Sequence, residues 1–230
     1  MSLNEYQRAV RQTVFSLLKE FENKHIRYFT RSALMKAPDY IWTIMASTSG
    51  KYHHGELLSE HMLKAYHYGR EHVRMLGWWW DRETVEIFMS ALLLHDAYRC
   101  GFEGRESTYE DGRYRTDYLH PIYAASELSR LEYNIPLPQQ ETEELGLVYV
   151  AKDQKWFKKF QKAVAGHMGP WSPLPECNPM NDNALSLRLH VFLVDYVVSR
   201  HNILTVVPEL QTGEMLALRN RYYPPVEEPE

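Results

Sequence analysis

The sequence predicts an all-α fold. Apolar residues recur at steps of three and four along most of the chain, the spacing of one face of an amphipathic helix. Hydrophobic residues make up 44% and charged residues 24% of the 230 residues, as in an ordinary globular protein able to bury a sizeable core. Because no internal repeat or linker-like stretch interrupts this pattern, we expect a single domain over residues 1–230, with its core at about 38–201.

The first half of the chain predicts four helices. The first has an apolar stripe that includes Val10, Val14 and Leu17. Pro38 is tolerated in the first turn of the second helix, and Gly77 is a plausible stop for the third. The four helices are expected over residues 4–22, 38–47, 55–76 and 82–94.

The second half begins with a long polar segment without a helical stripe. We expect residues 99–119 to form a loop, with a short hairpin around Asp111-Gly112. The tail, residues 208–230, ends in Pro- and Glu-rich sequence and is expected to fray. Helices are expected over residues 120–131, 141–150, 153–167 and 184–201.

Six residues of metal-ligand type are spread along these elements. The adjacent His95-Asp96 pair closes an apolar run, and Asp195 lies inside an apolar helix. Imidazole and carboxylate groups are costly at the edge of a core unless a partner satisfies them, and a divalent metal does so. Neighbouring helical residues point about 100° apart, so both members of a pair can reach one metal only at a helix end. The six are His61, His95, Asp96, His120, His167 and Asp195.

The order of these residues resembles the signature of the HD superfamily of metal-dependent phosphohydrolases. His61, His95-Asp96 and Asp195 match its four defining positions, and His120 and His167 match the two extra ligands of its two-metal members. The resemblance covers about residues 47–201. Three shorter strings are similar to segments of the phage-type HD proteins, namely residues 49–54, 167–171 and 195–200.

The resemblance implies a helical bundle around two metal ions. His61, His95, Asp96 and Asp195 would hold one ion, and Asp96 would bridge to a second ion held with His120 and His167. Such a set suits Mn, Fe, Co or Ni, and Mg or Zn are also compatible. The implied reaction is cleavage of a phosphomonoester or phosphodiester bond of a nucleotide or short oligonucleotide by metal-activated water.

The chain departs from the family pattern in two places. The family often has a lysine where this chain has Arg99, which can still hold an anion through its forked guanidinium group. The Gly-Gly-Leu run usual before the first ligand is replaced by residues 55–59. The family pattern therefore does not predict the backbone conformation of residues 55–59.

Four residues near the ligand segments are candidates for substrate binding. Lys51 and Arg99 are expected to orient a phosphate and, with Asp96, to form the catalytic set. Trp171 could stack on a base or cap the apolar core, since aromatic residues serve both purposes. His54 could contact the substrate or protonate the leaving group, or be a polar loop residue.

Composition limits the partners. A net charge of −4 provides no basic footprint for long nucleic acid, so we expect a small phosphorylated substrate such as a nucleotide. Two cysteines, no signal peptide and no membrane-spanning apolar run predict a cytoplasmic protein without a membrane partner. The Trp78-Trp79-Trp80 run predicts packing at a helix junction or a homo-oligomer contact.

Two other functions stay open. The HD superfamily also includes mixed-valent diiron oxygenases with the same six ligand types, so the fold alone does not fix the reaction. A non-catalytic nucleotide-binding sensor that retains the metal site is the third reading. Oxygen consumption would favour the oxygenase, and ligand binding without turnover would favour the sensor.

Overall fold

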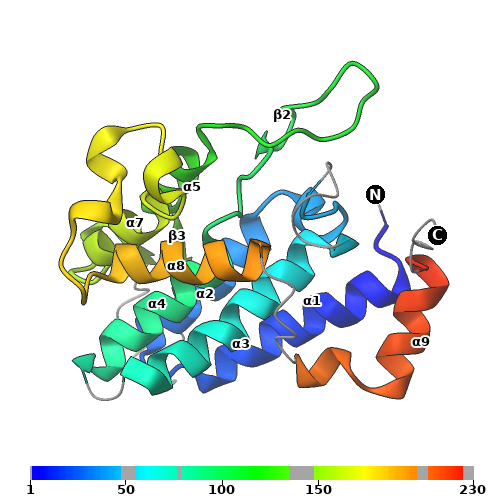
Figure 1. Ribbon diagram of the computed structural model, residues 1–230, viewed down its shortest axis with the longest axis horizontal. Helices are drawn as coiled ribbons and strands as arrows, with labels where there is room; N and C mark the ends of the chain where they lie inside the picture. The colour runs from blue at the N-terminus through cyan, green and yellow to red at the C-terminus, as the bar shows by residue number, and fades with distance from the viewer. Residues whose placement is uncertain (1, 48–54, 77–78, 135–147, 201–206, 225–230) are drawn as a thin grey trace.

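The computed structural model describes residues 2–47, 55–76, 79–134, 148–200 and 207–224. Within these ranges eight α-helices provide most of the secondary structure, and the strands form only two short antiparallel pairs (Figure 1). The predicted all-α class is therefore confirmed. None of the described helices is both long enough and apolar enough to cross a lipid bilayer.

Helix α4 (Arg82–Leu94) lies at the centre of the molecule. Residues 86–94 are all buried, because other helices cover α4 on several sides. In Figure 1, α8 (Leu187–Arg200) passes in front of α4, and α5 (His120–Ser129) and α7 (Phe157–Ala165) lie above α8 in the upper left of the view. The helices that pack against α4 are α2 (Lys24–Lys36), α3 (Leu58–Leu76), α7 (Phe157–Ala165) and α8 (Leu187–Arg200).

The N-terminal region contains a helix that the sequence analysis missed. Helix α1 (Glu5–Leu17) is capped by Asn4, and the chain then turns through η1 (Leu18–Glu20) into α2. Asn23 caps α2, since its side chain accepts hydrogen bonds from the backbone of His25 and Ile26. The apolar stripe of α2 is buried, and it consists of Ile26, Phe29, Ala33 and Leu34.

The prediction of a helix at residues 38–47 is wrong. This segment holds the 3₁₀ turn η2 (Asp39–Trp42), with Tyr40, Ile41 and Trp42 buried, and then an antiparallel bridge from Met45 to Leu57. Pro38 ends α2, because the residue before a proline avoids the helical conformation, and Ala37 is extended. The helices expected at 55–76 and 82–94 are present as α3 and α4.

The predicted loop at residues 99–119 is present and contains two hairpin-like turns. Strands β1 (Gly101–Phe102) and β2 (Arg105–Glu106) pair first, and a bridge between Thr108 and Tyr114 follows. The second turn encloses the expected Asp111-Gly112 position, where Gly112 has a φ of 79°. Figure 1 shows this segment extending away from the helices.

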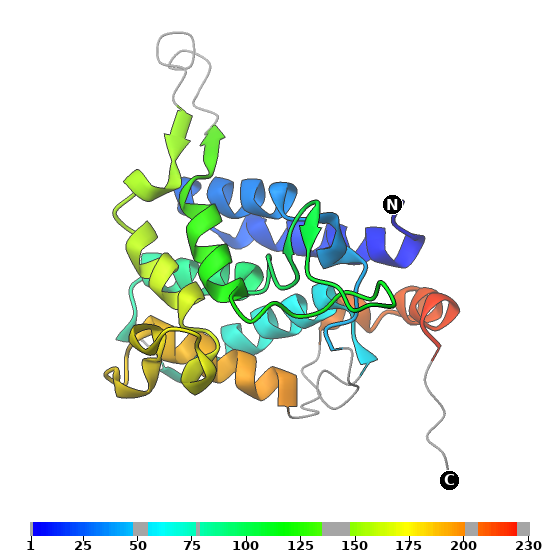
Figure 2. The same ribbon diagram turned by 90° about the horizontal axis from the view of Figure 1, so that it is seen from above.

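Residues 148–150 of the helix expected at 141–150 form a strand instead. Strand β4 (Val148–Val150) pairs with β3 (Glu132–Asn134), while residues 141–147 lie outside the described residues. Figure 2 shows the pair standing out from the helices. The helices expected at 153–167 and 184–201 are shorter, as α7 and α8. The remaining 3₁₀ turns are η5 (Ala151–Asp153), η6 (Gly169–Trp171), η7 (Pro175–Cys177), η8 (Pro179–Asn181) and η9 (Pro208–Leu210).

The expectation of a frayed C-terminal tail is wrong for the described residues beyond position 207. Helix α9 (Gly213–Tyr222) is capped by Thr212 and packs against α1. Arg219 of α9 donates to Glu60 at the start of α3, at 3.0 Å, and Glu60 also accepts from Tyr6 of α1 at 2.5 Å. Three distant parts of the chain therefore meet beside the first turn of α3.

Candidate metal centre

The structure brings the six predicted ligand-type residues together from five helices and their ends. Asp195 lies within α8, His61 in the first turns of α3, and His120 at the first position of α5. His95 and Asp96 lie in the tight turns that follow α4, which is the helix-end placement an adjacent pair needs to reach one centre. His167 lies in the turn after α7, and the next turn includes Gly169, where a side chain would collide with Phe192.

Three of the residues form a first group: His61, His95 and Asp195. The Nε2 atom of His61 is 3.3 Å from the Nε2 atom of His95 and 3.0 Å from Oδ1 of Asp195, and His95 Nε2 is 3.5 Å from the same oxygen. Ligand atoms bound at about 2.0–2.2 Å to one ion lie about 3.0–3.5 Å apart in octahedral or tetrahedral geometry. The spacing of the first group fits one ion.

The second group consists of Asp96, His120 and His167. Oδ1 of Asp96 is 3.1 Å from His120 Nε2 and 3.5 Å from His167 Nε2, and the two Nε2 atoms are 3.0 Å apart. Oδ2 of Asp96 lies 3.7 Å from Nε2 of His95 in the first group. Each oxygen of Asp96 therefore faces a different group.

The hydrogen-bond partners of the imidazoles also suit bound cations. His95, His120 and His167 each place Nδ1 beside a backbone carbonyl oxygen three residues earlier, at 2.9, 2.6 and 2.7 Å. An Nδ1–H that donates to such an oxygen leaves the Nε2 lone pair free toward the centre. All four histidines of the centre are at most 1% exposed, so buried Nε2 atoms that face one another need a shared proton or an ion.

The two aspartates supply negative charge to the centre. Burial raises the pKa of Asp96, but the guanidinium group of Arg99 and the imidazoles that face the carboxylate outweigh it and hold that pKa well below the usual range. Burial likewise raises the pKa of Asp195, but the imidazoles of His61 and His95 beside it outweigh burial and hold that pKa well below the usual range. Both carboxyl groups are therefore ionised at neutral pH. These buried His and Asp groups could hold metal ions.

A small cavity opens onto the second group and Asp195. Its volume is about 130 Å³, and Arg99 and Arg200 both line it. Arg99 donates from Nη1 to Oδ2 of Asp96 at 2.6 Å and from Nε to Thr116 at 3.2 Å. The sequence-predicted Arg99 thus reaches both a ligand-type carboxylate and the cavity.

A second small cavity lies against the first and is aromatic. Its volume is about 120 Å³, and it shares His167, Met168, Asp195 and Arg200 with the first cavity. Trp171 lines it, with its ring parallel to that of Tyr196 at 5.9 Å between centroids. Trp171 is 48% exposed, so it stands at the surface of this cavity rather than capping the core.

Two predicted site residues, Lys51 and His54, lie outside the described residues. The sequence analysis gave no role to Arg200, whose guanidinium carbon lies 4.3 Å from the Tyr196 ring centroid and 5.0 Å from that of Trp171. It also missed Glu56, which lies behind His61. The string of residues 195–200 contained a signal for Arg200, whereas no pattern in the sequence points to Glu56.

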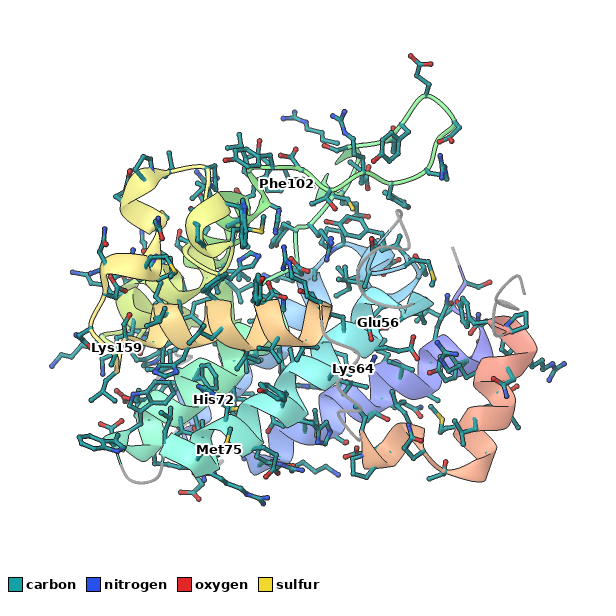
Figure 3. The ribbon with its side chains drawn as sticks, in the orientation of Figure 1. Glu56, Lys64, His72, Met75, Phe102 and Lys159 are labelled. Carbon is teal, nitrogen blue, oxygen red and sulfur yellow. The ribbon has the colours of Figure 1, made fainter. Side chains whose placement is uncertain are left out.

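A larger groove of about 860 Å³ lies elsewhere, between α5, α7 and the segment before α8, and its lining includes Lys159 but none of the six ligand-type residues (Figure 3).

No protein-family model matches the chain, and no curated protein or solved structure matches it significantly.

Proposed function

We propose that this protein is an HD-type, divalent-metal-dependent phosphohydrolase that cleaves a phosphate ester of a nucleotide or short oligonucleotide. The observation that supports this most is the pair of three-residue groups that meet at Asp96, next to a cavity lined by two arginines. Hydrolysis of phosphate esters needs cationic groups around the reacting phosphate, and this arrangement concentrates them.

The first ion would be held by His61, His95 and Asp195 and the second by His120 and His167, with Asp96 between them. Divalent ions bound at such a pair of sites acidify water and stabilise charge on phosphoryl oxygens. The imidazole and carboxylate donors suit Mn, Fe, Co or Ni. The role of the backbone carbonyls behind the imidazoles is to hold each ring in the orientation that binding requires.

Arg99 would orient the phosphate. Its guanidinium group has five N–H donors, and its contacts with Asp96 and Thr116 leave donors for an anionic ligand in the cavity. Arg200 lines the same cavity, and its position over Tyr196 and Trp171 restrains the guanidinium group. A phosphate in the cavity would lie among these two cations.

The neighbouring aromatic cavity supports a nucleotide as the substrate class. A phosphate group in the first cavity would place its organic part toward Trp171, Phe192 and Tyr196. A half-exposed indole ring offers a face on which a base can stack, which is worth about 1–3 kcal/mol per base. Both cavities are small, which favours a nucleotide or a chain end over long nucleic acid.

The test is an activity screen with a matched pair of variants. Protein stripped with chelator and reloaded with Mn²⁺, Co²⁺ or Fe²⁺ is incubated with nucleotides and a p-nitrophenyl phosphodiester, with and without oxygen. We expect metal-dependent phosphate ester cleavage that needs no oxygen. Asp96→Asn should remove metal and activity, while Asp111→Asn, which alters an exposed loop carboxylate, should change neither.

Full metal content and turnover in Asp96→Asn would overturn the assignment of Asp96 to both ions. Oxygen uptake without ester cleavage would replace hydrolysis with oxygenase chemistry. Nucleotide binding without turnover under every metal would leave a sensor rather than an enzyme.

A further inference from the structure

One of the four histidines in the centre is held differently from the others. His95, His120 and His167 face backbone carbonyl oxygens through Nδ1, whereas Nδ1 of His61 lies 3.4 Å from the carboxylate oxygen Oε1 of Glu56. A carboxylate is a stronger hydrogen-bond acceptor than a backbone carbonyl, and it raises the basicity of the imidazole in front of it. This difference is confined to the first group.

Glu56 is itself tightly placed. It is 3% exposed, and its other oxygen pairs with the ammonium group of Lys64 on α3. Figure 3 shows Glu56 and Lys64 near the start of α3. The backbone is also fixed, since Ala46 donates to the carbonyl of Glu56 at 2.8 Å and Leu58 donates to Ile44 at 2.9 Å. A buried carboxylate held in this way stays aimed at the imidazole.

The imidazoles of the second group have no such carboxylate behind them among the described contacts, since His120 and His167 each face a backbone carbonyl oxygen through Nδ1. Arg99 pairs with Oδ2 of Asp96 at 2.6 Å, which is the oxygen that faces the first group. This ion pair therefore weakens a carboxylate that both groups would share and does not distinguish them. The carboxylate of Glu56 is what distinguishes the first group from the second.

We propose that Glu56 is a positioning residue for His61, and that it makes the group of His61, His95 and Asp195 the tighter of the two ion sites. This inference rests on metal binding at the centre and not on hydrolysis. Glu56 would act through His61 alone, so its effect would be specific to one of the two sites.

The experiment measures Co²⁺ binding by titration calorimetry in two backgrounds that each leave one group intact. His120→Ala keeps the first group, and His61→Ala keeps the second. In the His120→Ala background, Glu56→Gln should weaken Co²⁺ binding about 10–100-fold, the usual effect of losing a carboxylate behind a ligand histidine. In the His61→Ala background it should change the affinity less than about threefold, since the partner imidazole is already absent.

Equal weakening in both backgrounds would mean that Glu56 supports the fold in general, and an unchanged affinity in the His120→Ala background would remove its role. Glu71→Gln provides the matched control, because this glutamate lies on α3, as His61 does, but is 54% exposed and forms an ion pair with Arg74. It should leave both affinities unchanged.

A second variant covers the case in which Glu56→Gln does not fold. Lys64→Gln keeps the carboxylate and removes the positive charge beside it, so Co²⁺ affinity at the first group should rise. A general loss of structure would lower the affinity instead, and a fall would contradict the proposal. Because these titrations contain no substrate, site-selective binding in a protein without ester cleavage would overturn the hydrolase and keep the role of Glu56.

Discussion

Among single residues, the acceptor that faces Nδ1 of each imidazole sets the orientation of the ring in the centre. Three histidines depend on carbonyl oxygens three residues earlier, which the local turn provides whatever the side chains are. The residue types and order of these histidines were visible in the sequence, because His95 closes an apolar run and His120 and His167 follow in the order of a known pattern. Glu56 was not, because it precedes the helix and only the fold brings its carboxylate to His61. Arg200 stood in the string of residues 195–200 but received no role, because its position over Tyr196 and beside the cavity is seen only in the structure.

We predict that the side chain of Arg99 contributes to substrate binding. Arg99→Ala should raise KM for a phosphorylated substrate about 10–100-fold with a smaller effect on kcat, since the cation binds phosphate in the ground and transition states alike. Steady-state kinetics on fully metal-loaded protein measures this. Arg113→Ala removes an arginine that is 67% exposed and should leave KM unchanged. A normal KM in Arg99→Ala would show that its guanidinium group does not contact the substrate.

Elements were predicted best where apolar residues run along most of the helix. Helices α3 and α4 meet that condition, and both lie near their expected bounds. Helix α2 has a shorter stripe among charged residues, and α9 has no buried residue of its own. Helix α9 is fixed instead by tertiary contacts such as Arg219 with Glu60, which no local pattern announces. Strand β4 depends on its pairing with β3, which is likewise non-local.

A further prediction concerns the packing of helix α3 against helix α4. A Cβ atom added at Gly69 would lie 2.2 Å from Cδ1 of Leu92, so the helices approach closely there. Gly69→Ala should therefore lower the free energy of unfolding, since overpacking costs about 1–3 kcal/mol and outweighs a helix-propensity gain of about 1 kcal/mol. Thermal or denaturant unfolding followed by circular dichroism measures the change.

The first position of α9 provides the matched control for Gly69. Gly213 has no atom within 4 Å of an added Cβ, so Gly213→Ala should raise the free energy of unfolding by about 0.4–1 kcal/mol. A stabilising effect at both glycines would mean that α3 and α4 are not in close contact at Gly69.

At the scale of the whole molecule, one apolar cluster extends from Tyr6 in α1 to Leu210 in η9. The centre lies where α3, α4, α5 and α8 converge with the turn after α7, so no single segment contains it (Figure 1). The fold class followed from helical periodicity, and the convergence of the six residues could be expected only from their resemblance to a known pattern. That residues 1–230 form a single domain stays a prediction.

Anomalous diffraction can show whether these six residues hold two ions. Crystals grown with Mn²⁺ and measured near the manganese absorption edge should show two anomalous peaks per chain. One should lie among His61, His95 and Asp195 and the other among His120, His167 and Asp96, each at about 2.0–2.3 Å from its ligand atoms. Well-ordered crystals with no peak between these residues, or with peaks only elsewhere, would rule out two ions at this centre.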